Sequence, residues 1–200
     1  YHGTEVLIKG EYRWQTYSPY VQGWAKMKLE DIATEQWQKG IKTTVYNCPE
    51  ILTNSSSIFV GVEVPLYPFI AALEKEAGQN AKVKTALAKC KGLLKPEHSF
   101  QEIQSFTDAT LTSKEILAHC EFDRWPQHNS KAQMETLIAA AEKLIGMHKD
   151  PKNLITFVLS EEIFRATGFV MYHDSFKPQA PVLWLGHDVL ANALASGKTL

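Results

Sequence analysis

The sequence lacks any apolar run near the length of about 18 residues that would span a membrane. It also lacks a glycine-rich loop of the kind that holds nucleotide phosphates. Its 21 basic residues nearly balance its 22 acidic ones, so no net positive charge recruits a phosphate backbone. These features predict no membrane span and no nucleic-acid partner.

Cysteine is scarce. The chain has three cysteines, Cys48, Cys90 and Cys120, an odd number at wide spacings that does not resemble a disulfide framework. This usage favours a reducing compartment, and therefore the cytoplasm over secretion. A starting methionine and a signal peptide are both missing, so we expect a domain excised from a longer protein.

The remaining composition is typical of a soluble globular protein, with 44% hydrophobic and 22% charged residues. Two hundred residues are enough for one domain with a sizeable core. We expect a single α+β domain over residues 1–200, which is β-rich over 1–64, helical over 65–167 and mixed over 168–200.

The clearest pattern lies at residues 130–167. Ser130 and Gln133 form a capping box, and apolar residues then recur at steps of three and four, which predicts a helix. Asp150 and Pro151 suit the start of a second helix, which we expect to end near Thr167. The second helix is apolar on most sides, so the spacing predicts an αα-hairpin with this helix buried at the centre of the core.

The segment before residue 65 contains three candidate strands, at Val6–Tyr12, Ile41–Tyr46 and Ile58–Val64. We therefore predict a small N-terminal antiparallel sheet of three to five strands, packed against a helical layer centred on the hairpin. Phe169–His173 and Val182–Leu185 could return to the sheet. The second of these runs fits the start of a terminal helix equally well, because periodicity does not separate the two in so short a run.

Two His-Asp dipeptides, His173-Asp174 and His187-Asp188, are candidates for catalysis. Histidine and carboxylate side chains are the ligands of hydrolytic metal sites, but their spacing does not put two of them on one helical face, and we predict no metal. Cys48 is a candidate nucleophile, with one of these histidines as its base and an aspartate to orient it. The alternative is that Cys48 is a free cysteine at the end of a strand.

Glu162 lies on the apolar stripe of the second hairpin helix. A buried carboxylate without a partner rises in pKa and can act as a general acid or base. The alternative is structural, since Arg165 lies three residues further on and can pair with Glu162 or with Glu161.

Aromatic residues gather between positions 12 and 37. Exposed tryptophan and tyrosine can stack on sugars or anchor a partner protein, and the candidate binding residues are Trp14, Tyr17, Tyr20 and Trp24. The alternative is that these rings form the core and rim of the sheet. A set of lysines around Val83 could contact an acidic partner or be the solvated face of a helix.

These patterns favour a binding or interaction domain of a larger protein, which uses the aromatic surface or a groove between sheet and helices. Its partner would be an unidentified protein, small molecule or glycan, and no cofactor is predicted. The alternative is a small hydrolase or transferase that uses a His-Asp pair with Cys48, Glu162 or a divalent metal. The sequence leaves open whether the protein is an enzyme.

Overall fold

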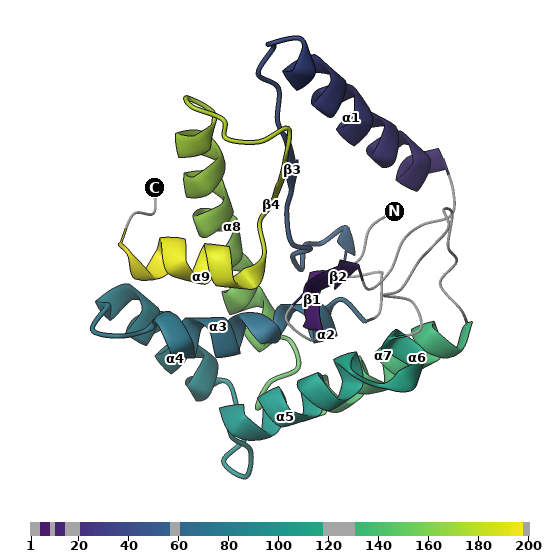
Figure 1. The fold of residues 1–200 in the computed structure, drawn as a ribbon. Helices are drawn as coiled ribbons and strands as arrows, with labels where there is room; N and C mark the ends of the chain where they lie inside the picture. Colours follow the sequence, from purple (N-terminus) through teal and green to yellow (C-terminus); the bar gives the residue numbers. More distant parts are fainter. Residues whose placement is uncertain (1–4, 9–10, 15–20, 57–60, 118–130, 198–200) are drawn as a thin grey trace.

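The computed structural model of the protein describes residues 5–8, 11–14, 21–56, 61–117 and 131–197 (Figure 1). It is mostly helical, with two small sheets. The helices are α1 Val21–Gln38, α2 Glu63–Leu66, α3 Pro68–Glu76, α4 Ala81–Gly92, α5 Phe100–Leu111, α6 Lys114–Leu117, α7 Lys131–Gly146, α8 Ile155–Asp174 and α9 His187–Ala195. The strands are β1 Glu5–Ile8, β2 Glu11–Trp14, β3 Val45–Asn47 and β4 Val182–Trp184.

The core is centred on α3 and the residues just before it. Tyr67, Phe69, Ile70 and Leu73 are fully buried. They are buried because α3 packs along α9, while α9 also packs against α8 and α4 lies against α8 (Figure 1). Burial of this many large apolar side chains is the main favourable contribution to folding. We call α3, α4, α8 and α9 the helical body.

The helix predicted after Asp150 exists, but it begins and ends later than predicted. The Asp150 carboxylate accepts hydrogen bonds from the Lys152 backbone and the Asn153 side chain at 2.8 Å, which closes a turn, and α8 starts only at Ile155. The helix continues past Gly168 to Asp174. It buries one face only, because Phe157 is 43% exposed and Phe164 is 67% exposed. The prediction of a helix buried on all sides was wrong.

The predicted hairpin also differs from the structure. Residues 131–146 do form a helix, α7, but it packs mainly on α2 and α5, while α8 packs on α4 and α9. Residues 147–154 connect the end of α7 to the start of α8. The two helices are therefore neighbours in sequence without packing as a pair. The proposed N-cap Ser130 lies outside the described residues.

The predicted antiparallel sheet is replaced by two pairs of strands. β1 and β2 pair antiparallel, and β3 pairs parallel with β4. The strand expected at Ile58–Val64 is not formed over its described part, since Gly61 has a φ of +108° and Glu63 begins α2. A positive φ is incompatible with extended β structure, so the backbone turns here.

The two C-terminal runs have different outcomes. Phe169–His173 belongs to α8 and is not a strand, whereas Val182–Trp184 is β4 and α9 starts three residues after it. Within the described residues, no helix is both long and apolar enough to cross a membrane.

Candidate functional site

The carboxyl ends of β3 and β4 lie side by side, with Asn47 opposite Trp184 in the parallel register. Helix α1 packs against both strands and brings Lys26 and Glu30 to this edge. In sheets with parallel strands, ligands bind in the crevice outside the carboxyl ends of the strands. We call Lys26, Glu30, Asn47 and Trp184 the α1–β3–β4 cluster.

The cluster is held together by Glu30. Its Oε1 atom accepts a hydrogen bond from Lys26 Nζ at 3.1 Å and another from Asn47 Nδ2 at 3.1 Å. Lys26 Nζ also lies 4.7 Å from the centre of the Trp184 ring, a distance at which a cation is attracted to the aromatic face. These contacts fix a lysine on a helix relative to two strands.

Lys26 is an unusually enclosed lysine, with a side chain only 10% exposed. Burial lowers its pKa, and the hydrogen bond and negative charge of Glu30 oppose that change. Desolvation disfavours the charged form of an amine, and a carboxylate beside it favours that form. An ionisable group perturbed in this way at the carboxyl ends of strands is a candidate functional residue.

Asn47 is buried, and its carboxamide is only half used. The Nδ2 group donates to Glu30, whereas Oδ1 is shielded from solvent and has no hydrogen-bond partner among the described residues. A buried acceptor without a donor costs free energy, so its retention calls for an explanation such as a bound ligand.

A tyrosine links β3 to the end of α8. The Tyr46 hydroxyl donates a hydrogen bond to Asp174 Oδ2 at 2.8 Å. Burial and the Asp174 carboxylate together raise the pKa of Tyr46 to about 12, so the phenol stays protonated at neutral pH. Asp174, a predicted catalytic residue, therefore has a structural partner.

The neighbouring candidates, His173 and Cys48, have different contacts. His173 is exposed, and its ring contacts Phe169 and Tyr172 on α8. Cys48 Sγ lies 3.7 Å from Met171 Sδ, and burial of the thiol raises its pKa, which disfavours the thiolate. No group of three metal-ligating side chains occurs within the described residues.

His187 and Asp188 begin α9, just after β4. The Nε2 atom of His187 is shielded from solvent and has no partner among the residues that the structure describes, while its ring contacts Phe69. Burial lowers the pKa of His187 to about 4, against the opposing charge of Asp188, so the ring is neutral at pH 7. Asp188 Oδ1 lies 3.9 Å from Lys75 Nζ.

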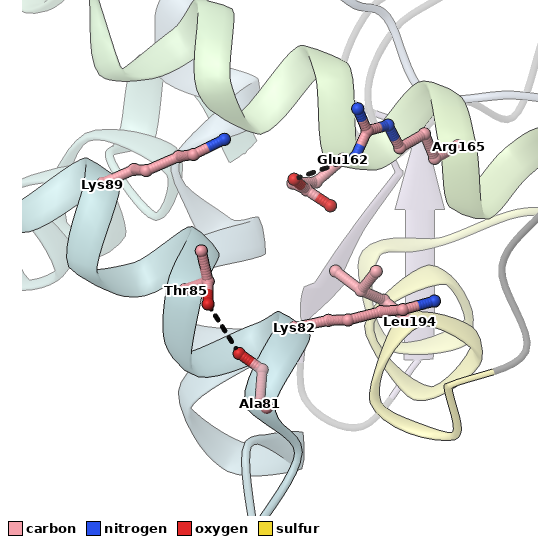
Figure 2. Close-up of a pocket in the computed structure, with 7 residues that line it drawn as sticks. All are labelled: Ala81, Lys82, Thr85, Lys89, Glu162, Arg165 and Leu194. Carbon is pink, nitrogen blue, oxygen red and sulfur yellow. Dashed lines mark hydrogen bonds and ion pairs between the residues drawn. The ribbon is translucent and has the colours of Figure 1, made fainter.

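Glu162 lies in a separate pocket between α4, α8 and α9, shown in Figure 2. Arg165 is 2.5 Å from Glu161 but 3.9 Å from Glu162, so its closer partner is the exposed carboxylate. Burial raises the pKa of Glu162, and the Arg165 charge offsets this change in part. The pocket is lined by Ala81, Lys82, Thr85, Lys89, Glu162, Arg165 and Leu194.

The aromatic binding candidates remain untested. Tyr17 and Tyr20 lie outside the described residues, and only the backbone is described at Trp14 and Trp24. Sequence analysis also missed the α1–β3–β4 cluster. A lysine four residues before a glutamate is common on helices, and the pairing of β3 with β4 leaves no local signal.

Comparison with known proteins provides the family. The family model described as enoyl-acyl carrier protein reductase FabMG matches residues 1–194. An apo structure of FabMG, described as a novel type of enoyl-acyl carrier protein reductase, is 44% identical with a TM-score of 0.86, and the match covers 98% of this chain and 44% of that one. An NADH-bound structure of FabMG is 42% identical with a TM-score of 0.77, over 98% of this chain and 48% of that one.

The chain thus spans about half the length of the solved structures it matches. No curated protein matches it. The family match overturns the prediction of a binding or interaction domain, and the hydrolase or transferase alternative is wrong as well, because a reductase is neither. The chain belongs to the FabMG family of enoyl-acyl carrier protein reductases.

Proposed function

We propose that this chain forms part of an NADH-dependent enoyl-acyl carrier protein reductase, in which the α1–β3–β4 cluster binds polar groups at the reacting centre. The observation that carries the proposal is the enclosed Lys26, held by Glu30 at the carboxyl ends of two parallel strands. A relative 42% identical to this chain was solved with NADH, which supports the cofactor.

The reaction sets clear requirements for the site. A hydride adds to the β-carbon of an enoyl thioester, negative charge develops on the thioester oxygen, and a proton then adds to the α-carbon. When bound, NADH would supply the hydride and would be released as NAD⁺. A fixed positive charge near the thioester oxygen lowers the barrier, because it stabilises charge that is absent from the substrate. Lys26 is suited to supply that charge.

The other members of the cluster fit this role. The buried Oδ1 of Asn47 can accept a hydrogen bond from a hydroxyl or carboxamide group of the cofactor, which would satisfy an acceptor without a partner among the described residues. Glu30 is a positioning residue, since the same oxygen holds both Lys26 and Asn47. The ring of Trp184 covers the ammonium group.

The test is the substitution Lys26→Met, with Lys28→Met as the matched control, because Lys28 is on the same helix and exposed. The full protein would be assayed for NADH oxidation with an enoyl-acyl carrier protein. We expect kcat/KM to fall by about 100-fold for Lys26→Met, a loss typical of removing one charge-stabilising group. The Lys28→Met variant should stay within about twofold of the wild type, as surface changes usually do.

A pH profile separates a direct role from a structural one. The charge on Lys26 is lost as pH rises through its lowered pKa, so activity should fall on the alkaline side. Glu30→Gln keeps a hydrogen-bond acceptor but removes the charge that raises this pKa, so the alkaline limb should move to lower pH. Two results would contradict the proposed role of the cluster. One is wild-type activity in Lys26→Met, and the other is a Glu30→Gln variant whose activity falls at the same alkaline pH as in the wild type.

A further inference from the structure

The pocket around Glu162 is separate from the α1–β3–β4 cluster. It lies at the C-terminal end of α9, whereas β4 ends near the N-terminus of that helix. Leu194 lies eight positions after Gly186, so the two places are about 12 Å apart along the helix axis. The pocket therefore needs its own explanation.

Its charge is strongly one-sided. Lys82 and Lys89 lie on one face of α4, and Arg165 projects from α8, so three cations line a pocket whose only carboxylate among the described residues is Glu162 (Figure 2). Arg165 also pairs with the exposed Glu161 beside the pocket, which leaves the two lysines as the main excess charge. The whole chain, by contrast, has a net charge of −1. An excess of positive charge around a hollow attracts anions.

The Glu162 carboxylate is nearly enclosed. Its side chain is only 9% exposed, and it forms an ion pair with Arg165 at 3.9 Å. Figure 2 shows Lys89 extending from α4 toward Glu162 across the pocket. A carboxyl group placed in this way can donate a hydrogen bond when protonated, and it repels an anion when ionised.

From this geometry we infer that the α4–α8–α9 pocket binds a phosphate ester group. Its volume is about 320 Å³, near the lower end of the range for ligand pockets, which suits one phosphate and a few attached atoms but not a whole dinucleotide. Lys82, Lys89 and Arg165 supply the cations, and the Glu162 carboxyl can donate to an anion oxygen when it is protonated.

Two sources of that phosphate ester fit this chemistry. One is the phosphopantetheine arm that carries an acyl thioester, and the other is a free nucleotide. The inference does not depend on the proposed reductase mechanism, because no residue of the α1–β3–β4 cluster lines the pocket.

Anion binding and protonation of Glu162 are linked. Burial raises the pKa of Glu162, a bound anion would raise it further, and the anion must therefore bind more tightly as pH falls through that pKa. Other charged or titratable side chains on the helices packed around Glu162 interact with it electrostatically. They are Lys82, Lys89 and Cys90 on α4, and Glu161 and Arg165 on α8. Helix α9 contributes the uncharged Leu194.

The first experiment uses sulfate as the probe, because its charge does not change over the range of the titration. Calorimetric titration of the full protein at about pH 5.5 and about pH 8 should give tighter sulfate binding at the lower pH. Glu162→Gln should bind tightly at both, and at about pH 8 it should bind about tenfold more tightly than the wild type, because glutamine carries no negative charge to repel the anion. Equal affinity and equal pH dependence in the two proteins would overturn the inference.

A second pair of variants keeps the test decisive if Glu162→Gln does not fold. Lys89→Met removes a lining cation and should weaken sulfate binding about fivefold. Lys91→Met makes the same change on α4 at an exposed residue that does not line the pocket, and it should match the wild type. Equal affinity in Lys89→Met and Lys91→Met would also overturn the inference.

Competition identifies the source of the phosphate. Displacement of sulfate by 4′-phosphopantetheine at lower concentration than ADP would assign the pocket to the carrier arm. The reverse order would assign it to a free nucleotide, and both results support a phosphate ester site. Failure of both compounds to displace sulfate would overturn the assignment. That result is independent of the Lys26→Met assay, which tests the proposed reductase function alone.

Discussion

The core around Tyr67 and the α1–β3–β4 cluster bury polar groups in different ways. In the core, the Tyr67 hydroxyl lies 3.1 Å from His148 Nε2, and His148 Nδ1 lies 2.7 Å from the Leu144 carbonyl. The carbonyl oxygen can only accept a hydrogen bond, so Nδ1 carries the proton and Tyr67 donates to Nε2. The cluster instead encloses a lysine and an acceptor without a described partner. The Tyr67–His148 pair satisfies its own donor and acceptor, whereas the cluster leaves an acceptor for a ligand.

This contrast predicts that substitutions in the core reduce stability, whereas those in the cluster reduce activity. The largest stability effect should come from α8. Ile163→Ala removes a fully buried side chain and should lower the free energy of unfolding by about 3 kcal/mol. Phe164→Ala, one residue along and 67% exposed, should change it by less than about 0.5 kcal/mol. Chemical denaturation measures both, and equal losses would show that the outer face of α8 is also packed.

The second prediction concerns acid. The pKa of folded His187 is about 4, below its ordinary value of 6.5, so the unfolded chain binds a proton in this interval that the folded chain does not. The contribution of His187 to stability is fully present above pH 6.5 and is lost as pH falls toward about 4. The loss approaches about 1.4 kcal/mol per pH unit.

Burial also lowers the pKa of His148, which adds to the loss in the same direction. Unfolding curves from neutral to acidic pH would measure the slope, and His187→Gln should reduce it because glutamine does not titrate. Above pH 6.5 the two proteins should show parallel curves. An unchanged slope in the variant would show that His187 takes up its proton without leaving the folded state.

The smallest effect should come from the neutral pair. Tyr67→Phe leaves His148 Nε2 buried without its donor and should cost about 1–2 kcal/mol of unfolding free energy. Tyr172→Phe removes a hydroxyl from a residue that is 51% exposed and should be nearly neutral. Thermal denaturation would compare them, and similar melting temperatures would mean that water replaces the missing hydroxyl.

Several local structures follow from residues close together in the sequence. The Asn80 side chain caps α4 by accepting from the Lys82 and Val83 amides, and Gly40, with a φ of +82°, follows the end of α1. Such features depend on residues a few positions apart. The start of α8 was predicted too early from the same kind of local signal. Asp150 can cap a turn as well as a helix, and here it closes a turn.

Long-range structure did not follow from these signals. The apolar alternation of Ile58–Val64 resembled a strand, but Val64 is packed in a short helix of the core. Ile41–Tyr46 was predicted to be a strand of an antiparallel sheet, but the strand is Val45–Asn47, and its parallel partner lies near the other end of the chain. The candidate site was missed for the same reason, since Lys26, Asn47 and Trp184 meet only after that pairing forms.

The pairing of β3 with β4 also sets an order of assembly. Thr44 Oγ1 bonds to the Ala180 carbonyl, 136 residues further along the chain. At a synthesis rate of about 5–20 residues per second, β3 would leave the ribosome many seconds before β4 exists. The helices between β3 and β4 would be synthesised before β3 has its partner strand. Lys26 on α1 would therefore be among the last side chains to be enclosed. A nascent chain stalled before β4 would carry α1 to α8 without the site and without α9.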